Sequence, residues 1–146
     1  MKVFKFGGAS VKDAAGVKNI LHVLRHTGFE DTLIVVSAMG KTTNALEQVV
    51  YSFFENKEQY HQDMEKVREN HHRIIEELFE LESATINQKV NALFDGVLTF
   101  LNTTDAQEYS LVYDQVVSVG ELVSTTIISH YMNKEGMENH WLDARE

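Results

Sequence analysis

The chain has 146 residues, enough for a single domain with a hydrophobic core. Its formal net charge of −9 argues against nucleic acid as the main partner, because a phosphate backbone attracts a surplus of lysine and arginine. The chain contains no cysteine, and no apolar run approaches the roughly 20 residues of a membrane span, so we expect a cytoplasmic protein that does not enter a membrane.

Two short segments near the N-terminus have the composition of β-strands. Lys2–Phe6 is rich in β-branched and aromatic residues and ends at Gly7 and Gly8. Thr32–Val36 is a continuous apolar run without alternation, which is typical of a strand buried on both faces.

The segment between these strands predicts a helix of about four turns. Ser10 is predicted to cap it, with Asp13 in its first turn, and Gly28 is predicted to end it. A strand, a helix and a second strand form a βαβ unit, which favours a parallel sheet with a right-handed crossover.

The segment from 44 to about 102 predicts a helical lobe, because it has almost no strand signal. Its three apolar stripes are Leu46, Val49, Val50, Phe53 and Phe54, then Tyr60, Met64, Val67, His71, Ile74, Leu78 and Leu81, then Ile86, Val90, Leu93, Val97 and Leu101. The second stripe has heptad spacing, as in a helical hairpin or a coil between subunits, and the third stripe favours the hairpin. His71, like His61 and His72, is interpreted as a packing or surface residue and not as a metal ligand, since no carboxylate or histidine partner recurs with it at ligand spacing.

Two further helices are predicted at about 106–117 and 121–132. Gly136 then breaks the chain, and His140–Leu142 resembles a third strand. The predicted fold is therefore α/β, with a mostly parallel sheet and an inserted helical lobe. A sheet of three strands is thin, so we expect residues 1–146 to be the front part of a larger domain.

The loop after the first strand is a candidate phosphate-binding site. Gly7 and Gly8 allow backbone N–H groups to approach an anion, Ser10 adds a hydroxyl, and Lys5 lies at the end of the strand, where ligands of open α/β sheets bind. The alternative is a plain turn beside a lysine whose charge reaches solvent. The Walker pattern and the dinucleotide fingerprint are both absent.

The loop after the second strand is also polar. Ser37, Thr42, Thr43 and Asn44 offer hydroxyl and amide groups, although Asn44 and Glu47 also have the spacing of a capping box. Because both strands belong to one βαβ unit, we expect the two loops to meet at the same edge of the sheet and to share a pocket.

Two charged positions nearer the C-terminus each allow a structural and a functional interpretation. Glu121 either completes a capping box with Ser118 or faces a cationic ligand group such as an amine. Arg145 either holds a carboxylate or phosphate or pairs with Asp143 or Glu146, and the structural interpretation is favoured.

Four motifs in this order resemble those of the aspartokinases, within the amino-acid kinase family. They are Lys-Phe-Gly-Gly-Ala-Ser at Lys5–Ser10, Val-Val-Ser-Ala-Met at Val35–Met39 with Thr-Asn at Thr43–Asn44, Ser-Val-Gly-Glu-Leu at Ser118–Leu122, and Trp-Leu-Asp-Ala-Arg at Trp141–Arg145. The resemblance spans the whole chain.

This resemblance implies a three-layer αβα sandwich and transfer of the γ-phosphoryl group of ATP to the side-chain carboxylate of L-aspartate, with Mg²⁺ bound through the nucleotide. It implies that Lys5 stabilises the transferring phosphoryl group and that Gly7, Gly8 and Ser10 contact phosphate. Ser37 and Thr43 would then hold aspartate, and Glu121 its amino group. The product would be 4-phospho-L-aspartate, a precursor of lysine, threonine and methionine.

The chain departs from the family pattern in two respects. Ala9 stands where the family usually has threonine, and the later Gly-Arg-Gly-Gly-Ser-Asp segment, the nucleotide-binding half and the ACT domains are absent. We therefore expect residues 1–146 to be the substrate-side part of the kinase domain, inactive alone, from a protein that forms homo-oligomers. The alternatives are another amino-acid kinase, acting on glutamate or acetylglutamate, a non-catalytic helical interaction domain and a metabolite-binding sensor.

Overall fold

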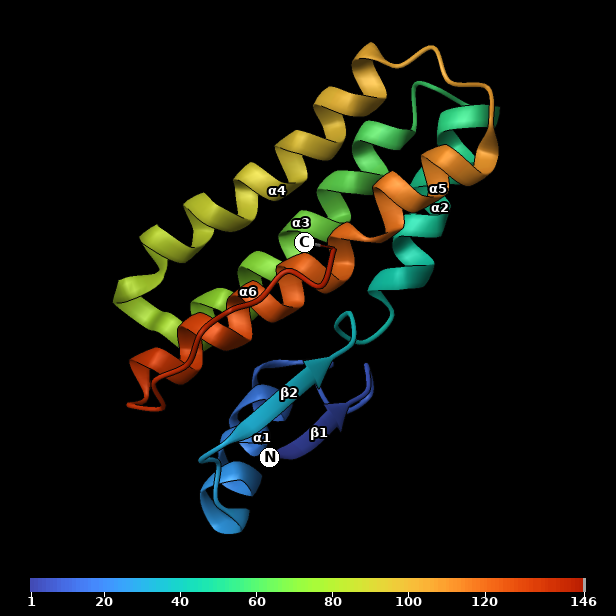
Figure 1. The fold of residues 1–146 in the computed structure, drawn as a ribbon. Coiled ribbons are helices and arrows are strands. Elements are labelled where there is room, and N and C mark those ends of the chain that lie inside the picture. Colours follow the sequence, from blue (N-terminus) through green and yellow to red (C-terminus); the bar gives the residue numbers. More distant parts are fainter. Residues whose placement is uncertain (146) are drawn as a thin grey trace.

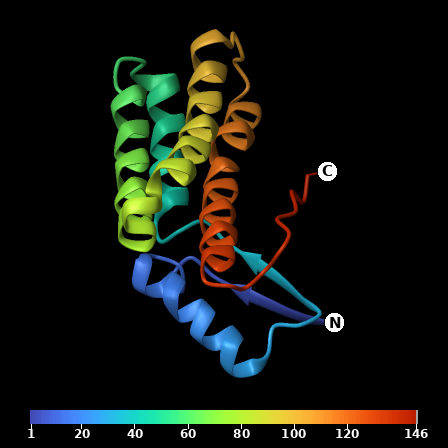
Figure 2. The ribbon, with the colours of Figure 1, turned by 90° about the vertical axis from the view of Figure 1, so that its left-hand side faces the viewer.

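Two parallel strands and one helix form one end of the molecule, and a bundle of longer helices forms the other (Figures 1 and 2). The computed structural model describes residues 1–145. The order β1 (Lys2–Phe6), α1 (Ala14–Thr27) and β2 (Thr32–Val36) is the predicted βαβ unit, and β1 pairs with β2 in parallel. The predicted α/β class and the bounds of both strands are confirmed.

Helix α1 begins later than the sequence predicts, because Asp13 and not Ser10 is its N-cap. The Asp13 carboxylate accepts a hydrogen bond of 2.8 Å from the Gly16 amide, which satisfies one free donor of the first turn. Ser10 belongs instead to a turn, in which its amide donates to the Gly7 carbonyl at 2.9 Å. Gly28, with φ of +80°, ends the helix as predicted.

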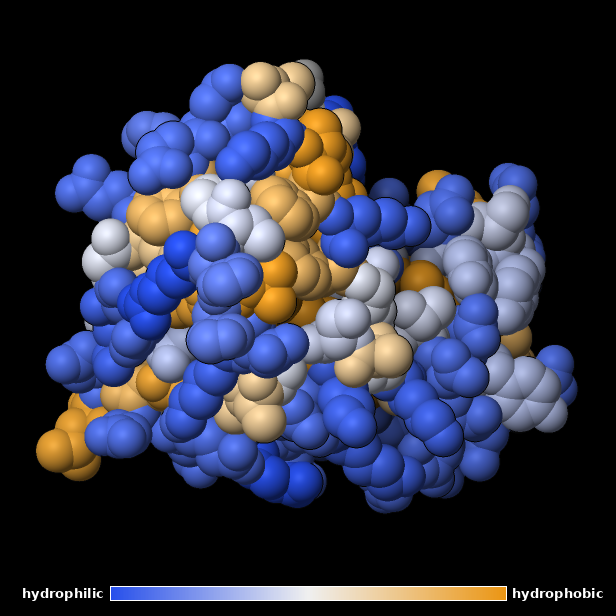
Figure 3. Space-filling model, turned by 90° about the horizontal axis from the view of Figure 1, so that it is seen from below, coloured by the Kyte–Doolittle hydropathy of each residue, from blue (hydrophilic) through white to orange (hydrophobic). Residues whose placement is uncertain are grey.

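The sheet is covered on one face only, so the prediction that β2 is buried on both faces is wrong within residues 1–145. Phe4 and Phe6 pack toward the core on the covered face. Val3, Leu33 and Val35, which alternate with the covered positions, are 61%, 41% and 45% exposed. Apolar side chains reach the surface at this end of the molecule (Figure 3). The sequence shows that β2 is apolar, but whether each face of the strand is buried depends on what packs against that face.

The bundle consists of α2 to α6. Their bounds are α2 Thr42–Glu55, α3 Tyr60–Phe79, α4 Ser83–Thr103, α5 Tyr109–Val117 and α6 Val119–Lys134, with a 3-10 turn at Glu80–Glu82 between α3 and α4. Helix α3 packs against α2 and α4, α4 against α6, and α2 against α5.

The heptad seam of α3 lies inside this bundle, which confirms the helical hairpin. Every predicted seam residue is buried except Leu81, which lies beyond α3 and is fully exposed. Polar contacts connect the two arms of the hairpin, since Arg68 binds Asn91 at 3.0 Å and Asp95 at 2.6 Å. The seam is therefore core within this chain, packed against its own neighbouring helices, and it is not exposed as a surface for a helix of another subunit.

Neither predicted capping box forms. Ser118 has helical dihedral angles and its side chain makes no capping hydrogen bond, so α5 and α6 follow each other almost without a break. Helix α2 begins at Thr42, before Asn44, and its N-cap residue Lys41 also makes no side-chain capping bond. The valines on both sides of Ser118 are buried, and a nearly continuous helix keeps them in the core.

Helices α5 and α6 together, Tyr109–Lys134, are long and apolar enough to cross a membrane by length and composition alone. Half of the most apolar window is buried inside the bundle. A core helix of a globular protein passes the same test of length and composition.

The predicted third strand at His140–Leu142 is absent from the described residues. This segment runs back beside α6 without regular structure (Figure 1). Asn139 exchanges hydrogen bonds with Ser129, and the Trp141 indole N–H donates to the Thr125 hydroxyl at 2.9 Å. A strand needs the backbone edge of a neighbouring strand, whereas side chains of a helix hold this segment.

Candidate functional site

The loops that follow β1 and β2 lie against each other, as predicted. The Ser37 amide donates to the Phe6 carbonyl at 3.1 Å, and the Gly40 amide donates to the Gly8 carbonyl at 3.0 Å. A side chain at Gly8 would lie 3.0 Å from the carbonyl oxygens of Ala38 and Gly40, so a larger residue would push the two loops apart. The parallel register brings the two carboxyl ends to one edge of the sheet.

The first turn of α6 contacts the second loop. A carboxylate oxygen of Glu121 accepts a hydrogen bond of 3.4 Å from the Ala38 amide, and the Ser124 hydroxyl donates to the Ser37 carbonyl at 2.8 Å. A side chain at Gly120 would come within 3.0 Å of the Ala38 side chain. Three segments far apart in the sequence therefore meet at one place.

Neither Gly120 nor Ser124 is predicted from the sequence to be a contact residue. A glycine in the first turn of an apolar helix is a signal of close approach, and Gly120 could have been recognised in this way. Ser124 carried no comparable signal, because a serine in mid-helix is ordinary and only its carbonyl partner gives it a role.

The predicted phosphate-site residues lie at the surface. Lys5 is exposed, on the open face of the sheet opposite Val35, and within residues 1–145 it makes no hydrogen bond or ion pair. Gly7 has no atom within 4 Å of the position a side chain would take, and Ser10 is exposed in the turn that follows. This loop therefore presents its backbone and one lysine to solvent.

The predicted substrate-site residues lie around the second loop. Ser37 is half-buried at the end of β2, Thr43 is half-buried in the first turn of α2, and Glu121 is exposed in the first turn of α6. The structure connects Ser37 to α6 through Ser124, and Glu121 to the same loop through Ala38. Neither Lys5 nor Thr43 makes a side-chain hydrogen bond to this group among the described residues.

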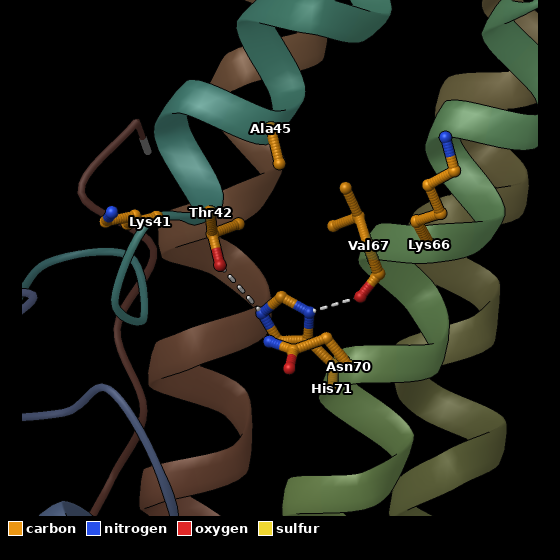
Figure 4. A pocket seen from close by; sticks show the side chains of 7 residues that line it. All are labelled: Lys41, Thr42, Ala45, Lys66, Val67, Asn70 and His71. Atoms are coloured by element: carbon orange, nitrogen blue, oxygen red, sulfur yellow. Dashed lines mark hydrogen bonds between the residues drawn. The ribbon is translucent and has the colours of Figure 1, made fainter.

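A pocket of about 180 Å³ lies beside the site, between the first turn of α2 and the middle of α3 (Figure 4). Its lining residues are Lys41, Thr42, Ala45, Lys66, Val67, Asn70 and His71. His71 is fully buried and has its ring between Thr42 and the Val67 carbonyl. Burial lowers the pKa of His71 below its ordinary value, so the ring is neutral at physiological pH.

Nothing within residues 1–145 forms a cluster of three or more histidine, aspartate or glutamate side chains that could hold a metal ion. The site instead offers backbone N–H groups, hydroxyl groups, the exposed ammonium of Lys5 and the exposed carboxylate of Glu121. The N–H groups and the ammonium suit an anion, and the carboxylate suits an amine.

Arg145 pairs with Asp143, as the favoured structural interpretation predicts. Its guanidinium donates to both carboxylate oxygens of Asp143 at 2.6–3.1 Å, and its backbone amide donates to one of them at 3.0 Å. These hydrogen bonds lower the pKa of Asp143 to about 2. The other predicted partner, Glu146, lies outside the described residues.

The model of the amino acid kinase family matches residues 1–146, and the chain belongs to this family. It is 34% identical to aspartokinase 2, chloroplastic, of Arabidopsis thaliana, covering 99% of this chain and 26% of that protein. It is 28% identical to bifunctional aspartokinase/homoserine dehydrogenase 2 of Escherichia coli, covering 99% of this chain and 18% of that protein.

Two crystal structures of E. coli aspartokinase III share the fold. The structure in complex with aspartate and ADP matches with a TM-score of 0.84 at 23% identity, over 99% of this chain and 31% of that one. The structure in complex with lysine and aspartate matches with a TM-score of 0.86 at 22% identity, over 99% and 32%. The chain thus spans about a quarter of the first of these relatives and a third of the solved structures.

Proposed function

We propose that residues 1–146 are the aspartate-side part of an aspartokinase, which transfers the γ-phosphoryl group of ATP to the side-chain carboxylate of L-aspartate. The product is 4-phospho-L-aspartate, and the reaction is the first step toward lysine, threonine and methionine. One observation carries this proposal: three of the motifs that resemble those of aspartokinases meet in the structure. Gly8 of the first motif contacts Gly40, which follows the second, and Glu121 of the third contacts Ala38 of the second.

The chemistry of the loops supports a phosphoryl transfer between two anions. Such a reaction needs oriented N–H donors and positive charge more than it needs a nucleophilic side chain. The open turn at Gly7, Gly8 and Ser10 supplies donors, and the exposed ammonium of Lys5 supplies charge. We assign phosphate contacts to these residues and stabilisation of the transferring group to Lys5, with Mg²⁺ bound through the nucleotide.

The other side of the site suits an amino acid. Ser37 and Thr43 offer hydroxyl groups for a carboxylate, and the exposed carboxylate of Glu121 offers a partner for an ammonium group. The relatives add support, since aspartokinase III was solved with aspartate and ADP. An amino-acid kinase acting on glutamate or acetylglutamate is the second candidate. Acetylglutamate lacks the ammonium that Glu121 would bind, whereas glutamate keeps it and differs from aspartate by one methylene group.

The assignment is tested by following backbone amide signals while L-aspartate is added to the chain. We expect weak saturable shifts confined to the loops around Ser37, Thr43 and Glu121, and we expect Glu121→Gln to abolish them. Glu138→Gln, an exposed glutamate beyond α6, is the matched control and should leave them unchanged. Equal shifts with N-acetylglutamate, or no shifts with any amino acid, would contradict the proposal.

The role of Lys5 is tested in a longer protein that contains this chain, with ADP release coupled to a spectroscopic assay. Lys5→Ala should lower turnover at least about 100-fold while folding stays intact, because the lysine acts on the transition state. Lys18→Ala, on the exposed face of α1, is the control. A loss of stability in place of turnover would make Lys5 structural.

Residues 1–146 alone should release no ADP with aspartate, because the proposal assigns the nucleotide-binding half and the ACT domains to a longer protein. Aspartate-dependent turnover by this chain would overturn that assignment. A cytoplasmic location and a homo-oligomeric assembly remain part of the proposal, and sedimentation of the longer protein tests the latter.

A further inference from the structure

We infer that His71 is a positioning residue, which holds the start of α2, and with it the polar loop after β2, against the helical bundle. Its imidazole stands between α3 and the first residue of α2 (Figure 4). The contact between His71 and α2 does not depend on the proposed function. The expected effect of His71 on aspartate binding, through the position of Thr43, rests on that function.

The hydrogen bonds of His71 assign its tautomer. Nδ1 lies 2.7 Å from the Val67 carbonyl oxygen, which only accepts, so Nδ1 carries the proton. Nε2 is then the acceptor, and the Thr42 hydroxyl donates to it at 3.4 Å. The ring of Phe94 meets the imidazole edge-on at 5.6 Å between centroids, which fixes the plane of the ring from the side of α4.

Thr42 transmits this contact to the site, because it touches three segments. Its hydroxyl meets His71, and its amide donates to the Met39 carbonyl at 2.9 Å. Its methyl group lies 3.4 Å from the position that a side chain at Gly120 would take, next to Glu121. Thr43 follows directly on α2, so a displaced Thr42 moves a proposed substrate residue.

The surroundings of His71 favour its neutral form. Lys41 and Lys66 line the same pocket, and His72 follows on the same helix. Helix α4 contributes the uncharged ring of Phe94, and none of the described lining residues is a carboxylate. A protonated ring would be buried without a counter-charge, so the contact with Thr42 belongs to the neutral state.

Two pairs of variants separate positioning from space filling. An asparagine at position 71 reaches the Val67 carbonyl but not Thr42, whereas a glutamine places its amide where Nε2 lies and reaches Thr42. Thr42→Val removes the donor at nearly constant volume, and Thr42→Ser keeps it. His71→Asn and Thr42→Val should therefore share one phenotype, and His71→Gln and Thr42→Ser should resemble the wild type.

The readout is amide hydrogen exchange of the whole chain, measured by NMR. The amides of Thr42 and Ala45, bonded to the carbonyls of Met39 and Lys41, report on the start of α2. We expect His71→Asn and Thr42→Val to speed their exchange about fivefold, as for the loss of one hydrogen bond, with amides of α1 unchanged. The double variant should be no faster than either single one.

A pH series adds a readout that a merely space-filling side chain would not give. Below about pH 6.5 the imidazole of His71 takes up a proton when local opening exposes it to solvent, but not while it is buried. Low pH therefore favours the opened state, and the protection of the Thr42 and Ala45 amides should fall relative to amides of α1. The same amides in His71→Gln should not respond. Unchanged exchange in Thr42→Val, or an equal increase over all helices in His71→Asn, would overturn the inference.

The aspartate titration on the same variants tests aspartate binding separately from the positioning of α2 by His71. If the wild type binds aspartate, His71→Asn should weaken binding about fivefold and His71→Gln should restore it. If the wild type shows no aspartate binding, the proposed function fails, while the exchange data still decide whether His71 positions α2.

Discussion

The helical bundle and the two-stranded sheet differ in how completely they cover their apolar side chains. Every predicted seam residue within α3 is buried, and Phe94 of α4 is fully buried between the helices. In the sheet, Val3, Leu33 and Val35 of the outer face remain open. Within residues 1–145 one core runs from α1 through the bundle, whereas the sheet has one covered face.

This difference has a physical origin in the two element types. A helix satisfies its backbone internally and needs a partner for one stripe, which a neighbour on the same chain supplies. A parallel strand needs neighbours at its edges and layers on both faces. The candidate site lies where the two regions join, because its loops follow the two strands and the second of them leads into α2.

The largest expected effect is at the centre of the bundle. Phe94→Ala should lower the free energy of unfolding by about 3–5 kcal/mol, because the truncation leaves a cavity among packed helices. Val3→Thr, on the open face of the sheet, should change it by less than about 0.5 kcal/mol. Urea unfolding of both variants measures this contrast, and similar losses would mean that the open face is covered in solution.

The junction between the regions should be next in sensitivity. Gly120→Ala should cost about 1–3 kcal/mol, because the new methyl group would lie 3.0 Å from Ala38 and 3.2 Å from Leu46. Gly96→Ala in α4, where no atom lies within 4 Å, should instead stabilise the chain by about 0.5–1 kcal/mol. Thermal unfolding of the two variants decides, and a loss of stability at both positions would contradict this account.

A polar contact between α2 and α3 makes the bundle sensitive to acid. Burial raises the pKa of Asp63, but hydrogen bonds from Ser52, Gln59 and Lys66 outweigh it and leave the pKa below its ordinary value of 3.8. The unfolded chain therefore takes up this proton first, so the stabilisation is complete well above pH 3.8 and is lost as the pH falls through the folded pKa.

Ser52→Ala removes the shortest of these bonds, 2.7 Å, and should cost about 1–2 kcal/mol at pH 7. The cost should shrink toward pH 3. Urea midpoints at several pH values test this, with Ser83→Ala at the start of α4 as the control. A cost that does not change with pH would show that the carboxylate is not the relevant partner.

The smallest effect is expected at the C-terminal segment, outside both regions. Arg145→Gln should raise the pKa of Asp143 from about 2 toward its ordinary value, because the bidentate guanidinium is lost. Because Asp143 and Arg145 are two positions apart, their pair also forms in the unfolded chain, and the unfolding transition should stay where it is. Carboxyl carbon chemical shifts during a pH titration measure the pKa, and a shifted unfolding transition would tie this pair to the fold.

The local elements were predictable from the sequence, because their causes are local. The strands at Lys2–Phe6 and Thr32–Val36 follow from β-branched and aromatic composition, and the helices of the lobe follow from apolar spacing. The meeting of the two loops also followed, since a βαβ unit places both strand ends at one edge. Each of these inferences uses neighbouring residues or a rule of connectivity.

Other features depend on partners that are distant in the sequence. Ser118 continues a helix that it was expected to begin, because packing of the whole helix outweighs a local cap. His140–Leu142 has the composition of a strand, but α6 holds it through hydrogen bonds of side chains. Composition indicates which secondary structure a segment favours, and the segments packed against it decide which one it adopts.

The sequence by itself determined the family resemblance, the strands, the helical stripes and the candidate residues around Gly8, Ser37 and Glu121. Only the tertiary structure decided that Glu121 contacts the loop at Ala38, and that His71 reaches the start of α2 through Thr42. The physical reason is that periodicity describes which face of an element is apolar. Which residue of another element meets that face depends on how the helices and strands pack together.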